Sequence, residues 1–349
     1  MKNYARYLRR FAILTVVMLA LIATMNWRVD PLQHYRTAAY PPLLVEQSRY
    51  RNPGLARHCT AQLVVAGTSV SRHQQPAELQ RIFGLPALNL AMDGASAHEQ
   101  YLLLRLVLRT GHVREVVWDV NYEYLRGKPD WVSDYDGAFP AYLYDDSAWN
   151  DVPHYLLNLD TCKNSLRILA RRCGIPAYKP RTAASFQEFE PGLKYGPASI
   201  EQNIERRRKR KAEFRAQIPE FTREQLRDSF EKNYLSLARE FPAVKFRLYF
   251  PPFSSTYFGV LHEIAPELLP VFVQSRDDVF AAALLLGNVE LNDLQSDIAL
   301  ISDTSHYSDP IHFDPATHTL VLEHIHNGSH LASQEKLATF KIFLEHSAQ

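Results

Sequence analysis

The chain is poor in cysteine and glycine and carries almost no net charge. Three cysteines occur among 349 residues and none forms a Cys-x-x-Cys pair, which excludes a zinc ribbon or a disulfide-dense scaffold. The formal net charge of +1 argues against nucleic acid as the main partner. Glycine, with 13 residues, is outnumbered by 21 prolines, and no internal repeat is found, so we expect a folded chain with long ordered loops.

The longest apolar run lies near the N-terminus. Residues 11–25 contain no charge and follow four basic residues. Extended to Trp27 at the interface, the run approaches the about 20 residues of a bilayer span. We therefore predict a basic cytoplasmic tail over 1–10 and a transmembrane anchor over 11–27. The rest would face the periplasm or cell exterior. A cleaved signal peptide and a buried soluble helix are the alternatives.

The three cysteines allow more than one arrangement. An exported chain permits a disulfide, and Cys162 with Cys173 is the pair that lies closest in sequence. Cys59 would then remain a free thiol. Three free, buried thiols are the alternative.

The remaining sequence alternates between strand and helix patterns. Short apolar runs predict five strands, near 62–66, 87–90, 115–120, 245–250 and 288–291. Helical patterns lie near 76–83, 96–109, 268–286 and 316–326, and the second has a capping box of Ser96 and Glu99. This alternation predicts an α/β fold with a parallel sheet of about five strands and right-handed crossovers.

The same patterns divide the chain. We predict a juxtamembrane linker over 28–61, an α/β domain over 62–330 with an insertion at 122–241, and a C-terminal helix over 331–349. The insertion is aromatic and acidic at first and strongly helical later, where it carries six consecutive basic residues at 206–211. Such a run is usually a solvated helix face, and contact with an anionic lipid or polymer is the alternative.

One serine stands where a nucleophile is expected. Ser69 follows the first predicted strand in the stretch Gly67-Thr68-Ser69 and precedes a helix. Open parallel sheets bind ligands beyond the carboxyl ends of their strands, and helix N-terminal amides there favour an anion. Taken alone, this pattern favours a helix-capping or turn serine over a nucleophile.

Two further loops are expected at the same edge of the sheet. The second strand is followed by Ala91, whose backbone N–H is a candidate oxyanion donor, and the third by Asn121, whose side chain is another. The neighbouring residues are candidates to line the substrate site: Arg72, Asn89, Gly94 and Tyr122.

A serine nucleophile needs a base and a group that orients it. Residues 302–315 hold two Asp-x-x-His copies, Asp303 with His306 and Asp309 with His312. In each, the carboxylate can turn to the imidazole Nδ1, which leaves Nε2 for the serine. Both pairs remain candidates on these residues alone.

With these motifs in order, the chain resembles the SGNH/GDSL hydrolase superfamily over about residues 62–326. The similarity is to its membrane-anchored acyltransferase-like branch, which includes the alginate O-acetylation proteins and DltD. The superfamily has four motifs, and this chain has a counterpart of each in the same order. They are Gly67-Thr68-Ser69, Asn89-x-Ala91-x-x-Gly94, Asp119-x-Asn121-Tyr122 and the Asp-x-x-His. Thr68, Ala91, Asp119 and Tyr122 depart from the usual residues.

The resemblance implies a three-layer, flavodoxin-like fold and a Ser-His-Asp triad. In the resembling proteins the histidine lies just before a helix and is followed by an aromatic residue and a proline, which favours Asp309 and His312. It also implies acyl transfer to or from a cell-surface or exported polysaccharide, with a membrane-bound O-acyltransferase as a possible partner. No cofactor is implied.

Two alternatives to a transferase remain open. A plain esterase would use the same serine, base and oxyanion donors, and an acceptor groove near residues 131–155 would distinguish a transferase. A catalytically silent accessory protein with the same fold would bind glycan or a membrane partner instead. No metal site is expected, because His324 and His326 alternate on a helix and do not share a face.

Overall fold

The structure, a computed structural model, describes residues 2–40, 44–135, 137–145, 147–176 and 192–347. The chain forms two compact units, and each is described by itself. The first joins Met1–His58 to Ala138–Ser185, and the second joins Cys59–Gly137 to Phe186–Gln349. In this grouping the chain leaves the second unit over 138–185, inside the insertion predicted at 122–241.

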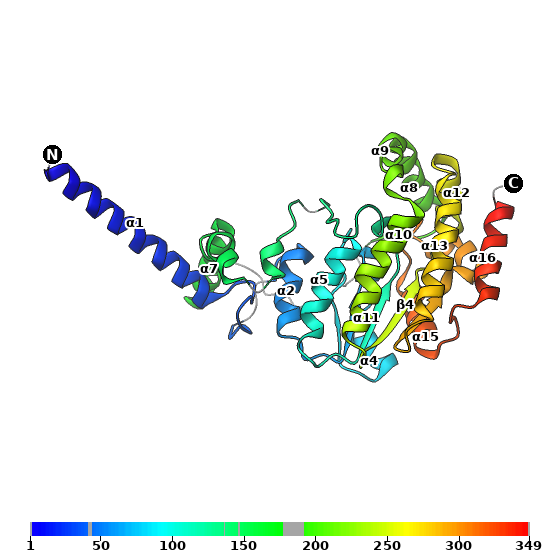
Figure 1. The fold of residues 1–349 in the computed structure, drawn as a ribbon, viewed down its shortest axis with the longest axis horizontal. Helices are drawn as coiled ribbons and strands as arrows, with labels where there is room; N and C mark the ends of the chain where they lie inside the picture. Colours follow the sequence, from blue (N-terminus) through cyan, green and yellow to red (C-terminus); the bar gives the residue numbers. More distant parts are fainter. Residues whose placement is uncertain (1, 41–43, 136, 146, 177–191, 348–349) are drawn as a thin grey trace. The chain divides into compact units, whose positions relative to one another are not determined.

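Helix α1 (Lys2–Val29) opens the first unit and is long and apolar enough to cross a membrane. The candidate span, Tyr4–Val29, has a window with mean hydropathy 1.9, and none of that window is buried inside the protein. The predicted anchor over 11–27 lies within this helix (Figure 1). A soluble core helix would bury an apolar face, and this one does not.

The rest of the first unit is a small set of helices. These are α2 (Ser48–Arg57), the 3₁₀ turn η2 (Ala141–Leu143), α6 (Ala148–Asp151), the π turn η3 (Val152–Leu156) and α7 (Leu159–Arg172). Asp30, just after α1, accepts backbone N–H groups of His34, Tyr35 and Arg36 and the hydroxyl of Tyr155, all within 2.9 Å. This carboxylate therefore ties the end of α1 to η3.

The structure decides between the two arrangements of the cysteines. All three are free, although only Cys59 is buried, while Cys162 is half-buried and Cys173 is exposed. Cys162 lies in α7 and Cys173 caps the same helix. Eleven helical residues rise about 16 Å, whereas a disulfide needs Cα atoms within about 7 Å. These two thiols therefore cannot pair while α7 is intact.

The second unit is built on a five-stranded parallel sheet. The strands are β1 (Leu63–Ala66), β2 (Ala87–Asn89), β3 (Glu115–Asp119), β4 (Lys245–Phe250) and β5 (Val289–Asp293), in the order β2-β1-β3-β4-β5. All four pairings are parallel. The predicted fold class is confirmed, and the strand order is the flavodoxin-like one.

Helices cover both faces of the sheet (Figure 1). On one face lie α5 (Ala97–Leu108), α10 (Arg223–Phe230), the π turn η6 (Glu231–Leu235), α11 (Ser236–Glu240) and α13 (Leu268–Ala283). On the other, α4 (Pro76–Phe83) packs against α15 (Pro315–Asn327). The short helix α3 (Ser69–Arg72) follows β1, and α8 (Pro197–Lys209), α9 (Lys211–Ala216), α12 (Ser255–Ile264), α14 (Ile298–Ser302) and α16 (Gln334–Ser347) complete the described helices. Single 3₁₀ turns form at η1 (Tyr122–Tyr124), η5 (Ile218–Glu220), η7 (Leu294–Ser296) and η8 (Thr304–His306).

Local sequence signals account for several of these boundaries. Ser96 and Glu99 form the predicted capping box of α5, and each side chain bonds the other's backbone N–H. Pro76 begins α4, and Gly84 ends it in the left-handed conformation. Helix α15 begins at Pro315 after its cap Asp314, which accepts the N–H of Thr317.

A buried ion pair joins the helix layer to the sheet. Arg276 of α13 is 1% exposed and donates to the carboxylate of Asp293, at the end of β5, and to Gln295. Its guanidinium also lies over the ring of Phe250, 4.8 Å from the centroid. Tyr122 lies in the same cluster, stacked on Phe272. Two charges out of water are tolerated here because each has a close, hydrogen-bonded partner.

Replacing Arg276 by Met should therefore lower the free energy of unfolding by about 3–5 kcal/mol, because Asp293 keeps a buried charge without its partner. The matched control is Arg223→Met, which breaks an ion pair with Asp278 on a half-exposed surface. That change should cost less than about 1 kcal/mol. Guanidinium denaturation followed by tryptophan fluorescence measures both, and equal losses would contradict this account of Arg276.

Candidate active site

A sharp turn between β1 and α3 presents Ser69. Gly67 has φ +140°, which side chains rarely adopt, and a Cβ there would lie 2.2 Å from Oδ2 of Asp119. Thr68 is fully buried, and Ser69 begins α3 half-buried. Only glycine at position 67 lets the chain pass this close to the end of β3.

Asp119, the last residue of β3, holds this turn. Its Oδ2 accepts the backbone N–H of Thr68 at 2.9 Å and the hydroxyl of Ser71 at 2.6 Å. Burial raises the pKa of Asp119 to about 6, even though these hydrogen bonds act to lower it. Within the described residues its Oδ1 has no hydrogen-bond partner. The carboxylate is therefore a structural clamp in a costly environment.

Neighbouring strands reinforce the turn. The hydroxyl of Tyr249, from β4, bonds Ser71 Oγ at 2.8 Å and accepts from Gln74 at 2.8 Å. Asn89, at the end of β2, donates through Nδ2 to the carbonyls of Ser71 and Gln74, both at 2.8 Å. Side chains from three strands thus bind the segment that begins with the serine.

The structure brings Ser69 together with one of the two Asp-x-x-His pairs. Nε2 of His312 lies 2.8 Å from Oγ of Ser69, and its Nδ1 lies 2.6 Å from Oδ2 of Asp309. The contact joins α3 to the loop before α15, 243 residues further along the chain. All three side chains are half-buried. The serine, imidazole and carboxylate are thus connected in the order that a nucleophile, a base and an orienting group require.

The Asp309 carboxylate is fully engaged. Oδ1 accepts the backbone N–H groups of Ile311 and His312 at 2.8 and 2.9 Å, while Oδ2 faces the imidazole. Burial acts to raise the pKa of Asp309, but the bonds from His312 and these two amides outweigh it and lower the pKa. The carboxylate therefore stays ionised at neutral pH and holds His312 with Nε2 toward Ser69.

The second pair has a different place. Nδ1 of His306 lies 3.0 Å from Oδ2 of Asp314, and its Nε2 lies 3.4 Å from Oδ2 of Asp303. The bond from Asp314 raises the pKa of His306, although burial opposes it. Because Asp314 also caps α15, this histidine closes the loop onto the helix start. The structure brings Ser69 to His312 and not to His306.

The two predicted oxyanion donors differ in their surroundings. The backbone N–H of Ala91 donates to Oδ1 of Asn89 at 2.8 Å, so it is used in the turn after β2. Asn121 is 2% exposed, and its Oδ1 accepts the N–H of Glu123 at 3.1 Å. That bond fixes the amide and leaves the donor group, Nδ2, on its other side. The bond printed for Asn121 therefore uses its oxygen and not its donor group, whereas the Ala91 donor is already engaged.

The four residues predicted to line the substrate site also differ in burial. Tyr122 is fully buried and donates to Gln295 at 2.9 Å, and Asn89 is 1% exposed, so both serve the interior rather than a substrate surface. Gly94 has φ +63°, and a Cβ there would lie 2.7 Å from the ring of Tyr135. Arg72 is half-buried and pairs with Asp93 at 2.6 Å. Of the four, Arg72 keeps a charged, partly accessible side chain one turn after Ser69.

A cavity of about 560 Å³ lies beside Asp309, the carboxylate of the Ser69 cluster, by which we mean Ser69, His312 and Asp309. Its lining includes Asp309 and Pro310 together with Tyr124, Tyr135 and three arginines of the basic run, Arg206, Arg207 and Arg210. The remaining arginine, Arg208, points elsewhere and pairs with Glu201, Glu205 and Glu263. The basic run is thus divided between a solvated ion-pair face and the wall of this cavity.

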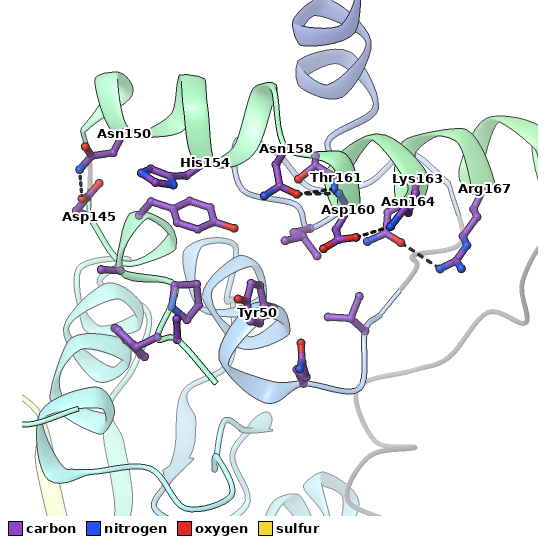
Figure 2. A pocket seen from close by; sticks show the side chains of 18 residues that line it. Tyr50, Asp145, Asn150, His154, Asn158, Asp160, Thr161, Lys163, Asn164 and Arg167 are labelled. Carbon is purple, nitrogen blue, oxygen red and sulfur yellow. Dashed lines mark hydrogen bonds and ion pairs between the residues drawn. The ribbon is translucent and has the colours of Figure 1, made fainter. Parts of the chain in front are cut away.

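A larger cavity of about 900 Å³ lies wholly within the first unit (Figure 2). Figure 2 shows polar side chains along one wall, including Asn158, Asp160 and Lys163 from the start of α7. Tyr142 and His154 stack with ring centroids 5.5 Å apart. The cavity takes in part of the 131–155 segment for which an acceptor groove was predicted.

One group within the described residues has the composition of a metal site. Asp297, His324 and His330 each offer a ligand atom, and these atoms lie within 4.8 Å of one another. None of the three belongs to the Ser69 cluster. The expectation of no metal site rested on His324 with His326, whereas the structure brings His324 to His330.

Comparison with known proteins adds little to this description. No protein-family model matches the chain, and no curated protein matches it. Among solved structures, a protein from Streptococcus pneumonia described as a candidate platelet activating factor matches with a TM-score of 0.40 and 12% identity, covering 86% of this chain and 92% of its own. A likeness this distant carries no argument about activity.

Asp119 is the residue whose role the sequence analysis missed. It was noted only as a departure from a motif, although a charged residue at the end of an apolar strand is itself a signal. Asp119 and Ser71 are 48 positions apart, and Ser71 and Tyr249 are 178 apart, so only the folded chain brings them together.

Asp119→Asn should change how stability depends on pH. The folded pKa of Asp119 is raised from 3.8 to about 6, so the wild-type protein loses stability as the pH rises from about 4 to 6. The loss amounts to about 3 kcal/mol, at about 1.36 kcal/mol for each pH unit. The variant cannot ionise and lacks this loss. Unfolding free energies measured at pH 4, 5, 6 and 7 test this, and parallel curves for the two proteins would contradict it.

Proposed function

We propose that the chain is a membrane-anchored serine acyl-transfer enzyme, with Ser69 as nucleophile, His312 as base and Asp309 as the residue that orients the base. What supports the proposal most is the pair of contacts at His312, 2.8 Å from Ser69 Oγ and 2.6 Å from Asp309 Oδ2. Fold likeness alone would not support it, because folds of this kind serve many functions.

In the first half-reaction, Ser69 Oγ attacks the carbonyl carbon of an ester or other acyl donor. The hydroxyl proton passes to Nε2 of His312, and the charge of the resulting imidazolium faces the ionised Asp309. When the tetrahedral intermediate collapses, the bond to the leaving oxygen breaks and that oxygen takes the proton from His312. The acyl group then remains on Ser69.

In the second half-reaction, a hydroxyl group attacks the acyl-serine. His312 takes the proton of this hydroxyl, and Ser69 Oγ leaves and is reprotonated by His312. A sugar hydroxyl as acceptor makes the enzyme an O-acyltransferase, and water makes it an esterase. Both use the same residues, so they differ only in the acceptor that reaches the acyl-serine.

The negative charge of each tetrahedral intermediate needs hydrogen-bond donors. We propose the backbone N–H of Ser69 and Nδ2 of Asn121 for this role. The N–H of Ala91 joins them only if it leaves Asn89, to which it donates in this structure. Its engagement is the observation that favours the alternative, a catalytically silent protein that binds a glycan or a membrane partner.

The setting of the reaction belongs to the same proposal. Basic residues before the candidate span favour a cytoplasmic N-terminus and an α/β unit outside the bacterial inner membrane. The chain resembles polysaccharide-modifying proteins, and on that basis the acyl group goes to or comes from a cell-surface or exported polysaccharide. A membrane-bound O-acyltransferase is the partner that would supply it.

A fluorophosphonate probe tests the nucleophile in the purified full-length chain in detergent. The wild-type protein should become labelled, and Ser69→Ala should abolish labelling. His312→Ala should slow labelling by about 100-fold or more, since a general base typically contributes a factor of this size.

His306→Ala is the matched control, because it removes a histidine of the same loop that contacts Asp314 instead of Ser69. Its labelling rate should stay close to wild type. Labelling that persists in Ser69→Ala would exclude Ser69 as nucleophile. A folded wild-type protein that is not labelled at all would support the silent binding protein.

A further inference from the structure

A turn after α15 brings two histidines together. Gly328 ends the helix in the left-handed conformation, with φ +67°, and reverses the chain. His330 then lies against His324 of the last helical turn, with ring centroids 4.1 Å apart. His326, two residues after His324, lies instead against Phe83, with 4.9 Å between the ring centroids.

An acidic residue from another element completes the group. Asp297 precedes α14 and accepts the N–H of Leu300 at 3.1 Å, which fixes its position. Its Oδ2 lies 3.4 Å from Nε2 of His330. His330 is fixed independently, because its carbonyl accepts the N–H of Asp293 at 2.7 Å. The three side chains therefore meet through backbone that is already held in place.

Ser329 orients both imidazoles. Its Oγ lies 2.7 Å from Nδ1 of His324 and 3.3 Å from Nδ1 of His330. A metal-binding histidine usually donates its other ring N–H to an oxygen atom that fixes its tautomer. With both Nδ1 atoms directed to Ser329, the Nε2 atoms remain as the ligand atoms, and a carboxylate oxygen faces one of them.

The spacing fits a small divalent cation. With bonds of about 2.1 Å, a tetrahedral zinc ion holds its ligand atoms about 3.4 Å apart. The Asp297–His330 pair already has this separation, and each of the three residues offers a ligand atom within 4.8 Å of those of the other two. Rotation of partly exposed side chains covers the difference.

We propose that Asp297, His324 and His330 form a zinc site, with Ser329 as the residue that orients the two imidazoles and water as the fourth ligand. Two imidazoles and one carboxylate are a donor set that suits Zn²⁺. Two charged groups also act on the site: Glu323 favours the cation and Lys336 opposes it.

The site has a structural role in this proposal. Its ligands come from both sides of the segment that carries Asp309 and His312, since Asp297 precedes that segment and His324 and His330 follow it. A bound ion joins the start of α14 to the end of α15. The ion would thus hold together the two ends of the segment that contains His312. Zinc binding at these residues does not require Ser69 to be catalytic.

Zinc content of the purified full-length chain tests the site. The protein is isolated through a tag without histidine, stripped with a chelator, dialysed against Zn²⁺ and measured by elemental analysis. About one zinc should bind per chain, and His324→Ala and His330→Ala should each retain less than about one tenth of it at the same free zinc concentration. Ser329→Ala should weaken binding by about 10- to 100-fold, as loss of an outer-shell partner does.

His326→Ala is the control, since it removes an exposed histidine two residues from His324 that faces Phe83. It should bind zinc as the wild-type protein does, and circular dichroism checks that every variant is folded. Wild-type protein that takes up no zinc would overturn the proposal. So would equal uptake by the His324, His330 and control variants. Co²⁺ substitution, read by visible absorption, checks the tetrahedral geometry.

Discussion

The candidate site depends on one buried carboxylate. Asp119 receives the backbone N–H of Thr68 and the hydroxyl of Ser71, and so it binds the residues on both sides of Ser69. Gly67 is required because any side chain there would collide with this carboxylate. Burial raises the pKa of Asp119, so the clamp costs stability at neutral pH. The chain tolerates that cost at the turn that presents Ser69 to His312.

A second carboxylate does similar work on the histidine side of the pair. Asp309 uses one oxygen for two backbone amides of its own loop and the other for His312. Asp309 therefore fixes the backbone of this loop and the orientation of the imidazole at the same time. Ser69 and His312 come from distant parts of the sequence, yet each lies in a turn that a carboxylate holds. Asp119 holds the turn of Ser69, and Asp309 holds the turn of His312. Their contact joins two segments that are already ordered.

Much of the fold follows from local pattern, and less of the site does. Apolar runs and the capping box at Ser96 were sufficient for the strands and for α5, because these signals lie within a few residues. The order of the motifs led to Ser69 and both Asp-x-x-His pairs. The resemblance already favoured His312 over His306, and the structure brings His312 to Ser69. The burial of Tyr122 and the role of Asp119 depend instead on contacts between distant segments. Sequence spacing does not encode those contacts.

The rigidity of the turn has a consequence for chemical probes. Because side chains from three strands hold the segment that begins with Ser69, the fold fixes the position of the serine hydroxyl. The neighbouring cavity has a different character, since its wall is built from long arginine and tyrosine side chains. On the role proposed for Ser69, a covalent inhibitor would draw its reactivity from that serine and its selectivity from groups that contact the cavity lined by Arg206 and Tyr135.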